Sequence, residues 1–247
     1  MRILVTGAKG FIGRPLVKAL ELAGHTVLQW DLPEQDITKP FAIKNPLDAV
    51  IHLAAVASPP LCDKDPALAY NVNVQGTHNM LKAAVAAKAR RFVLASSAHA
   101  YGISPLYLPT DERAPQSVFD TYTTTKLLSE RLCGLFWENY GLSYAAIRLF
   151  NGYGPGQPVG YFVADKITQA MAGDFELRGA KTTKDWVYID DVVRAYQLAV
   201  ESPFVGAINV GTGVETDLET IGRQIAAKFN VQMTIQPLNF NFPGFAA

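Results

Sequence analysis

The sequence predicts an α/β fold, in which a doubly wound parallel β-sheet is covered by helices on both faces and followed by a small C-terminal lobe. Short apolar runs alternate with longer amphipathic stretches along most of the 247 residues, as in parallel strands joined by helices. Gly7, Gly10 and Gly13 come directly after the first apolar run, where a strand turns sharply into a helix. A Gly- and Pro-rich segment at 151–160 separates 1–150 from a smaller part, 151–247. We expect the two parts to be interleaved, without a flexible linker.

The expected elements follow one another without an internal repeat. A strand at 3–5 leads into the glycine turn and then into a helix over 11–23, which Gly24 ends. Three prolines within 32–48 leave room for at most a short helix there. The tail 238–247 carries no charge, and either its aromatic side chains pin it down or it marks a chain that stops early. The other expected elements, in chain order, are strands at 25–31 and 49–55, a helix at 66–88, a strand at 91–97, a loop at 98–119, a helix from 120 or 121 to 140, a strand at 142–149, a helix at 162–172, short strands near 175–177 and 186–188, a helix at 190–201, a strand at 207–210 and a helix near 218–229.

The composition argues against several classes of protein. Lys plus Arg (22) balance Asp plus Glu (22), so the formal charge gives no reason to expect nucleic acid or an anionic membrane as a partner. No apolar run approaches the ~20 residues that span a bilayer, and the first strand begins too early to leave room for a signal peptide. Cys62 and Cys133 make neither a redox nor a metal-binding spacing. We therefore expect no metal, two buried thiols and a cytoplasmic location.

The glycine turn has the spacing of a dinucleotide-binding site. Gly7 allows the sharp turn, Gly10 allows the backbone to approach a pyrophosphate, and Gly13 allows the helix to pack against the strand. The amide groups and the positive dipole end of that helix would then face the phosphates. An ordinary strand-turn-helix corner is the alternative. The first part, 1–150, is accordingly expected to be a dinucleotide-binding domain of the Rossmann type.

An acidic residue at the end of the second strand supports this interpretation. Asp31 lies 24 residues after Gly7, close to the ~20-residue offset of the carboxylate that binds an adenosine ribose. A carboxylate there accepts hydrogen bonds from the ribose hydroxyls and repels a 2′-phosphate, which favours NAD over NADP. Arg14 could offset that preference, and a solvated residue at a strand end is the alternative for Asp31.

A tyrosine and a lysine supply the candidate chemistry. Tyr122 and Lys126 lie at i and i+4, on one face of the helix that starts near residue 120. A free phenol has a pKa near ~10, and the lysine, together with an oxidised nicotinamide, is expected to lower it so that the phenol serves as a general acid and base. A tyrosine and a lysine four residues apart often occur by chance on an exposed helix. The preceding strand, however, ends at Ser97, at the sheet edge where a cofactor would lie, and this order along the chain favours catalysis over a strand-end serine bonded to backbone.

Several sequence blocks together resemble the extended short-chain dehydrogenase/reductase family, particularly its nucleotide-sugar epimerase branch. They are T-G-A-K-G-F-I-G, D-I-T from Asp36, H-L-A-A from His52, N-V-Q-G-T from Asn73, S-S-A-H-A-Y-G ending at Gly102, Y-T-T-T-K, R-L-F-N-G-Y-G-P and W-V-Y-I-D-D-V. The resemblance implies Ser97, Tyr122 and Lys126 as catalytic residues. It also implies that the helices at 66–88 and 120–140 pair into a homodimer, although Leu127, Leu128, Leu132, Leu135 and Phe136 equally fit packing against the sheet.

The binding residues that the turn, Asp31 and the resemblance together indicate fall into two sets. The cofactor set is Gly7, Gly10, Phe11, Ile12, Gly13, Asp31, Asp36, Ile37, Leu53, Ala54, Ala55, Asn73, Tyr122 and Lys126. The substrate set is Ser97, His99, Tyr122, Asn151 and Lys184.

Three departures from the family's pattern narrow what the resemblance implies. Ser97-Ala98-His99 stands where the branch's dehydratases have Thr-Asp-Glu, so the carboxylates that eliminate water are missing, which argues against dehydration. The related decarboxylases also tend to carry the Glu, so its absence argues against decarboxylation as well. His99 is either an extra acid or base, or a histidine of the loop. Lys184 replaces the usual Arg and contacts a phosphate as a point charge rather than as a fork. A later segment that supplies another substrate arginine is lacking, so we expect a reduced substrate-binding lobe in 151–247.

The leading functional prediction is an NAD-dependent C4 epimerase of a nucleotide-linked sugar, which acts through a transient keto intermediate. The second is an NAD(P)-dependent ketoreductase or dehydrogenase of a nucleotide-sugar or a small sugar acid. A dinucleotide-binding sensor without turnover is the alternative of another class, and the retained Tyr122–Lys126 pair argues against it.

Overall fold

The fold is built on a six-stranded parallel sheet with the strand order β2-β1-β3-β4-β5-β9. The structure, a computed structural model, describes residues 1–39 and 41–237, so the predicted tail 238–247 lies outside the described residues. Because β1 lies inside the sheet and later strands add on both sides of it, the sheet is doubly wound, as predicted. Its strands are β1 (Arg2–Thr6), β2 (Thr26–Trp30), β3 (Ala49–His52), β4 (Arg91–Ser97), β5 (Ser143–Leu149) and β9 (Gly206–Val210).

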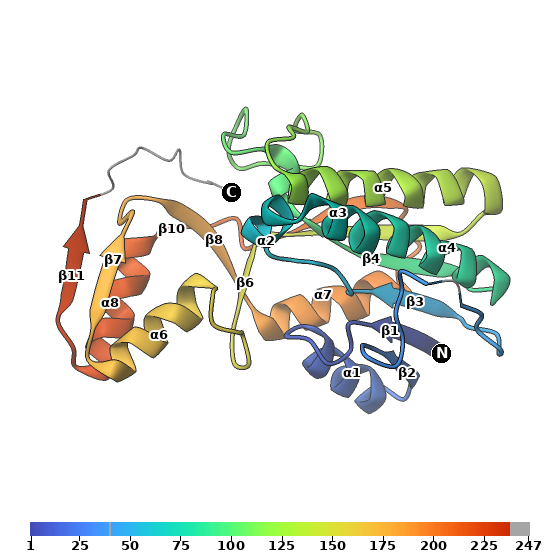
Figure 1. Ribbon diagram of the computed structural model, residues 1–247, viewed down its shortest axis with the longest axis horizontal. Helices are drawn as coiled ribbons and strands as arrows, with labels where there is room; N and C mark the ends of the chain where they lie inside the picture. Colours follow the sequence, from blue (N-terminus) through green and yellow to red (C-terminus); the bar gives the residue numbers. More distant parts are fainter. Residues whose placement is uncertain (40, 238–247) are drawn as a thin grey trace.

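Alternate side chains of the strands feed two separate cores, one on each face. Ile3 and Val5 pack with α1 (Gly13–Leu22) and α7 (Ile189–Glu201). Leu4 points the other way and packs with residues of α4 (Gly76–Ala86) and α5 (Thr121–Tyr140). This two-residue alternation follows from the pleat of a strand. Figure 1 shows α3 (Pro66–Ala69), α4 and α5 on one side of the sheet and α1 and α7 on the other.

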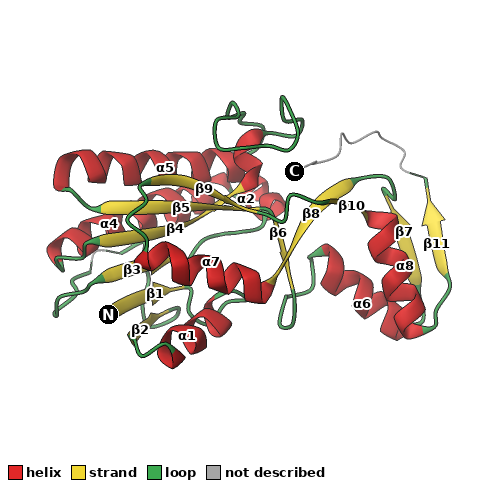
Figure 2. Cartoon of the chain, turned by 180° about the vertical axis from the view of Figure 1, so that it is seen from behind, coloured by secondary structure: helices red, strands yellow, loops and turns green. Residues whose placement is uncertain are grey.

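The C-terminal part divides between the main sheet and a separate lobe. After β8, the chain returns through α7 to β9, which pairs with β5 at the edge of the main sheet. The lobe lies beyond the ends of the main strands (Figure 2) and has its own small core around Phe175 and Ile225. It comprises a three-stranded sheet of β6 (Asn151–Tyr153), β8 (Thr183–Tyr188) and β10 (Glu215–Asp217), the parallel pair β7 (Phe175–Arg178) and β11 (Met233–Gln236), and the helices α6 (Phe162–Ala172) and α8 (Leu218–Phe229).

The long helix expected at 66–88 is interrupted, which corrects the sequence prediction. Within this range the chain forms α3 (Pro66–Ala69), then a π-helical turn (Tyr70–Gln75) that leads into α4. A short helix that was not predicted, α2 (Pro59–Lys64), precedes α3. The carbonyl of Asn73 in this turn accepts hydrogen bonds from the hydroxyls of Thr77 (2.6 Å) and Ser129 (2.9 Å). Side chains from outside the turn therefore stabilise its widened form, and hydrophobic periodicity carries no signal for such contacts.

Four further short elements were not predicted. Strand β6 forms within the Gly- and Pro-rich segment, and a short 3-10 helix (Ala98–Tyr101) opens the loop after β4. Strands β10 and β11 also escape the sequence analysis. Each strand is three or four residues long, so its pairing partner decides its conformation rather than its own propensity.

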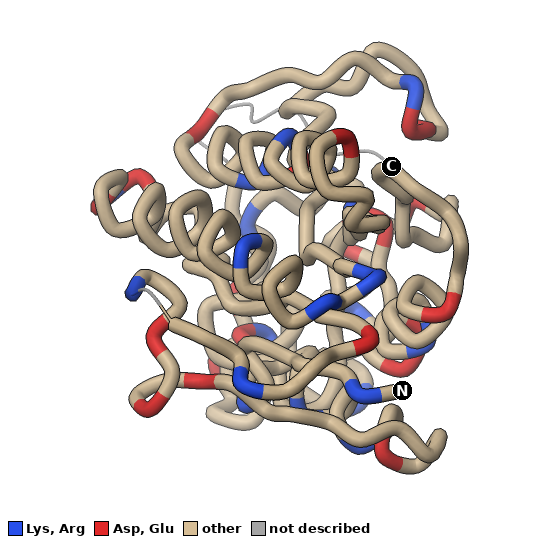
Figure 3. Tube along the Cα trace, turned by 90° about the vertical axis from the view of Figure 1, so that its right-hand side faces the viewer, with Lys and Arg blue, Asp and Glu red and all other residues tan. Residues whose placement is uncertain are grey.

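Charge and helix length bear on possible partners. Figure 3 shows basic and acidic positions interspersed along the trace. Among the described helices, none combines the length and the apolar character that a membrane span requires.

A buried histidine of β3 is hydrogen-bonded to side chains of both β1 and α4. His52 is 2% exposed and lies between the hydroxyls of Thr6 (2.7 Å from Nδ1) and Thr77 (3.2 Å from Nε2). Because Thr77 donates its proton to the carbonyl of Asn73, it accepts from Nε2–H, and Nδ1 accepts from Thr6. His52 is therefore a neutral imidazole. Burial, helped by the charge of Lys126, lowers the pKa of His52 to about 3.

This histidine predicts a loss of stability in acid. The unfolded chain protonates His52 below its ordinary pKa of 6.5, whereas the folded chain stays neutral until about 3. The contribution of His52 is thus complete above pH 6.5 and declines as the pH falls through that window, by about 2 kcal/mol between pH 7 and pH 5. Urea unfolding at both pH values measures this loss. The variant His52→Gln should lose about 2 kcal/mol less than the unmodified chain, and an equal loss in both would contradict the assignment.

Candidate active site

A cavity of about 1150 Å³ lies at the carboxyl ends of β1, β3, β4 and β5 and extends to the C-terminal lobe. Its volume is at the upper end of the ~300–1,000 Å³ typical of ligand sites, which suits a cofactor and a substrate together. The cavity brings together nearly all the site residues that the sequence predicts. Those lining it are Gly7, Gly10, Phe11, Ile12, Gly13, Asp31, Asp36, Ile37, Leu53, Ala54, Ala55, Ser97, His99, Tyr122, Lys126, Asn151 and Lys184.

Asn73 is the exception, because it does not line the cavity, and its place along the cofactor stays a prediction. It is 2% exposed and lies behind the cavity wall. Its side chain accepts from the amide of Val56 (2.7 Å) and donates to the carbonyl of the same residue (3.1 Å) and to the Thr125 hydroxyl (3.0 Å). Asn73 thus ties the wall segment after β3 to the helix that carries Tyr122.

The glycine turn leaves no room for side chains. Gly7 has φ +67°, and a Cβ on it would lie 2.9 Å from the amide nitrogen of Ala54. A Cβ on Gly13 would lie 2.1 Å from the carbonyl oxygen of Gly7. No side chain caps α1 at Ile12, so the start of this helix borders the cavity without a protein group over it. This cradle fits the diphosphate of a dinucleotide.

The residues expected around the adenosine end are fixed by local hydrogen bonds. The carboxylate of Asp31 accepts from the amides of Lys9 (2.7 Å) and Leu32 (2.9 Å). Arg14, considered as a counterweight to Asp31, instead donates to the carbonyl of Lys9 (2.7 Å). Hydrogen bonds from Thr38 lower the pKa of Asp36. The carboxylate of Asp31 thus retains lone pairs for a ribose.

Helix α5 positions the candidate acid and base despite the three threonines between Tyr122 and Lys126. Asp120 caps the helix by accepting from the amide of Thr123 (2.6 Å). The hydroxyl of Thr125 donates to the carbonyl of Tyr122 (2.8 Å) and accepts from Asn73. Capping and buried hydrogen bonds therefore compensate for the low helix propensity of threonine.

Lys126 and Ser97 both lie near the side chain of Tyr122. The ammonium of Lys126 donates to the carbonyl of Ala95 (2.9 Å) and lies 5.6 Å from the centroid of the Tyr122 ring. The side chain of Ser97 lies close enough to the phenol to lower its pKa. The predicted trio is thus assembled where β4 ends.

Burial, not Lys126, sets the acidity of the phenol in the chain alone. Desolvation raises the pKa of Tyr122 well above its ordinary value, and the hydrogen bond from Ser97 opposes part of this rise. Burial also lowers the pKa of Lys126 to about 8. In the chain alone both groups lose the solvation that favours their charged forms, and the lowering of the pKa of Tyr122 by the lysine together with an oxidised nicotinamide stays a prediction.

The substrate half of the cavity is more aromatic than the sequence predicts. His99 meets the Tyr122 ring edge to face (5.5 Å between centroids, 88°), and burial lowers its pKa. Burial also lowers the pKa of Lys184 to about 8. The amide of Asn151 donates to the carbonyl of Asp185 (3.1 Å), so Asn151 lines the cavity while it also binds β8.

Three aromatic residues of this half were missed by the sequence analysis. Tyr161, Phe162 and Trp186 line the cavity, and the rings of Phe162 and Trp186 lie 5.6 Å apart. Their only sequence signal is their place beside the Gly- and Pro-rich segment and Lys184. In the described part of the chain, no cluster of three or more His, Cys, Asp or Glu residues could hold a metal ion.

Comparisons with known proteins agree with this arrangement. The sequence model of the NAD dependent epimerase/dehydratase family matches residues 3–211. The UDP-glucose 4-epimerase of Mycolicibacterium smegmatis is 33% identical over 92% of this chain and 82% of its own length. The GDP-6-deoxy-D-mannose reductase of Pseudomonas aeruginosa is 30% identical over 95% of this chain and 82% of its own. The crystal structure of Thermotoga maritima UDP-glucose 4-epimerase with UDP-glucose has a TM-score of 0.90 and 26% identity, covering 100% of this chain and 90% of that one.

The placement of Asp31 predicts cofactor preference. Asp31→Ser removes an acceptor for ribose hydroxyls and the charge that repels a 2′-phosphate. Since a charge-assisted hydrogen bond contributes ~1.5–3 kcal/mol, the ratio of the NADP to the NAD dissociation constant should fall at least about tenfold, measured by calorimetry. The control is Glu34→Ser, an exposed acid that pairs with Lys9. An unchanged ratio in Asp31→Ser would show that another group selects the cofactor.

Proposed function

Because this chain belongs to the NAD-dependent epimerase/dehydratase family, we propose that it is an NAD-dependent epimerase that inverts C4 of a nucleotide-linked sugar through a transient keto intermediate. One observation carries the proposal: Ser97, Tyr122 and Lys126 line the same cavity as the glycine turn. The similarity to two UDP-glucose 4-epimerases supports the choice of reaction. In this proposal, the C-terminal lobe supplies part of the substrate half of the cavity, through residues such as Asn151 and Lys184.

The cavity fits NAD in its shape and its polar groups. The turn formed by Gly7, Gly10 and Gly13, which a Cβ would fill, would hold the diphosphate, with Asp31 at the adenosine ribose. Tyr122 and Lys126 would hold the nicotinamide ribose. When bound, NAD supplies a hydride acceptor that later returns the hydride, so epimerisation needs no external oxidant or reductant.

The residues of the chain account for the proton transfers. Ser97 holds the reacting oxygen of the sugar, and the phenolate form of Tyr122 removes the hydroxyl proton and later returns it. The ammonium of Lys126, 5.6 Å from the ring centroid, stabilises the phenolate. Because Tyr122 and Lys126 are only 9% and 5% exposed, this attraction is stronger than it would be in solvent.

A reductase or dehydrogenase of a nucleotide-sugar or a small sugar acid is the second candidate. Lys184 carries a point charge, and burial lowers its pKa to about 8. It therefore binds a diphosphate less firmly than an arginine would. The similarity to a reductase also favours this candidate. Dehydration is less well supported, because Ala98 and His99 occupy the positions of the two carboxylates. The retained trio likewise argues against a sensor without turnover.

We also propose a homodimer formed by α4 and α5, and a cytoplasmic location. Among the apolar residues of α5 that could form this interface, Leu127 and Phe136 are buried, whereas Leu128 and Leu135 are 42% and 53% exposed. The exposed pair lies at i and i+7, on one face of α5. Cys62 and Cys133 are both free thiols, which suits a reducing compartment.

The variant Tyr122→Phe tests the proposed reaction. Turnover of a panel of UDP-, GDP- and dTDP-sugars, followed by NMR, should fall at least about a hundredfold, because general acid–base catalysis is lost. NAD binding should stay within about twofold of the unmodified chain, since the ring still fills its place. Retained turnover would overturn the mechanism. Release of NAD on denaturation of the purified protein supports the epimerase, and a need for added cofactor with a matching absorbance change supports the reductase.

The dimer is tested by the single variant Leu135→Glu. A charge at the centre of an apolar helix interface is costly to bury, so light scattering at micromolar concentration should show a monomer. The control is Leu22→Glu, which places the same charge on an equally apolar but 79% exposed residue of α1 and should leave the dimer intact. A monomeric unmodified chain, or a dimeric Leu135→Glu variant, would contradict the interface.

A further inference from the structure

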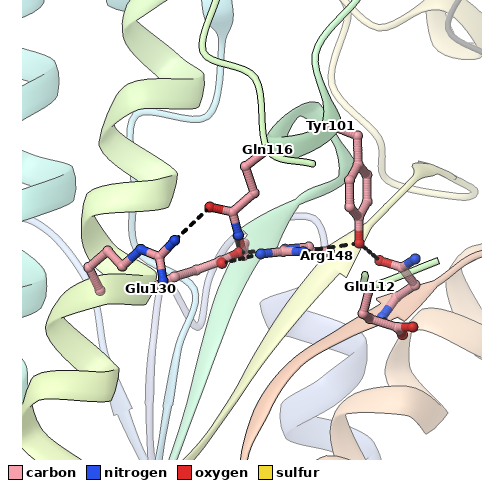
Figure 4. A network of polar contacts seen from close by, with 8 residues as sticks. Tyr101, Glu112, Gln116, Glu130 and Arg148 are labelled. Carbon is pink, nitrogen blue, oxygen red and sulfur yellow. Dashed lines mark hydrogen bonds and ion pairs between the residues drawn. The ribbon is translucent and has the colours of Figure 1, made fainter. Parts of the chain in front are cut away.

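A buried ion pair lies outside the cavity, on the α5 side of the main sheet. The guanidinium of Arg148 contacts the carboxylate of Glu130 through two hydrogen bonds, Nη2 to Oε2 (2.6 Å) and Nε to Oε1 (3.0 Å) (Figure 4). Arg148 is 2% exposed and Glu130 is 7% exposed. Neither is among the described residues that line the cavity.

Stability alone gives a weak reason for this pair. Removing two charges from water is costly, and well-packed apolar side chains of similar volume are often at least as stabilising. The groups that the pair holds in place are therefore more informative than the pair itself.

Glu130 joins the helix of the candidate acid and base to the end of β4. Tyr122, Lys126 and Glu130 follow one another at i, i+4 and i+8 along one stripe of α5. The hydroxyl of Ser96 donates to the carboxylate of Glu130, and the ammonium of Lys126 donates to the carbonyl of Ala95. The next residue of β4 is Ser97. Two successive turns of α5 are thus fastened to the two residues that precede the candidate serine.

Arg148 joins the same point to the loop that follows Ser97. Ser96, Arg148 and Asn209 are neighbours in register across β4, β5 and β9. The hydroxyl of Tyr101 accepts from Nη1 of Arg148 (3.1 Å) and donates to Oδ1 of Asn209 (2.5 Å). The amide of Asn209 donates in turn to the carbonyl of Thr110 (3.1 Å). These hydrogen bonds therefore hold the loop after β4 on the same face of the sheet as α5, which carries Glu130.

We propose that Glu130 and Arg148 form a positioning pair, which fixes the hydroxyl of Ser97 relative to the phenol of Tyr122. The proposal rests on the proposed function, since it takes those two groups as catalytic. Ser97 extends from β4 and Tyr122 from α5, so their separation depends on how these two elements dock. Beside the contact between Lys126 and the carbonyl of Ala95, the pair and Ser96 provide a second buried polar contact that sets this docking.

The test replaces the whole pair by apolar side chains of similar size, in the double variant Glu130→Leu/Arg148→Met. Removal of both charges avoids an uncompensated ion in the core, so the variant should fold with a melting temperature close to that of the unmodified chain. The kcat should fall about tenfold to a hundredfold, because a misplacement of about 1 Å costs up to ~10² in rate. The KM for the sugar and the affinity for NAD should change less than about twofold.

A spectroscopic titration gives a second readout that does not need turnover. Phenolate absorbance of Tyr122 is obtained as the difference from the same protein carrying Tyr122→Phe. If Ser97 moves away, the phenol loses the hydrogen bond that lowers its pKa, so the titration midpoint should move to higher pH. The matched control is Arg91→Met, which removes a buried guanidinium from the opposite end of β4 and should leave both kcat and the titration unchanged.

A folded double variant with unchanged kcat and an unchanged titration would overturn the proposal. If the double variant does not fold, Ser96→Ala cuts only the link between Glu130 and β4 and should lower kcat and raise the midpoint in the same direction. Unchanged values in Ser96→Ala would equally overturn it. These outcomes can be told apart from failure of the proposed function, which would appear as retained turnover in Tyr122→Phe. The titration needs no turnover, so it still reports whether the pair positions the phenol.

Discussion

The contact between Lys126 and the carbonyl of Ala95 is the constraint on which the site depends. It fastens α5 to the end of β4 by a hydrogen bond of 2.9 Å and places an ammonium beside the ring of Tyr122. Burial at this junction has two opposite consequences. It raises the pKa of the phenol and lowers that of the lysine, so neither group readily holds its charge in the chain alone. A further positive charge in the cavity would favour the phenolate form of Tyr122.

Buried polar side chains hold the elements around this junction in register. Asn73 ties the segment after β3 to α5, and His52 links β1 with the helix that follows the π-helical turn. Glu130 and Arg148 do the same for β4, β5 and the loop beyond Ser97. Such groups are costly to bury unless every partner is in place. These side chains therefore determine how α5 packs against the carboxyl-terminal edge of the main sheet.

The sequence predicts the parts of this structure that depend on local chemistry. The glycine turn, the alternation of strands and helices and the order of Ser97, Tyr122 and Lys126 are all readable because backbone geometry or spacing dictates them. The π-helical turn at Asn73 is not, since it is stabilised by Thr77 and Ser129 from outside the turn. The cluster of Tyr161, Phe162 and Trp186 was also not predicted, because the start of α6 and strand β8, which carry these residues, come together only through tertiary packing. The direction of the phenol's pKa required knowledge of its burial, which periodicity does not give.

The most direct test of the account is the titration of the Tyr122 phenol with and without NAD, followed by difference absorbance against Tyr122→Phe. The account predicts a midpoint above the ordinary value near ~10 in the chain alone and below it when NAD is bound. A midpoint that stays above ~10 in both states would contradict the assignment of this phenol as the acid and base.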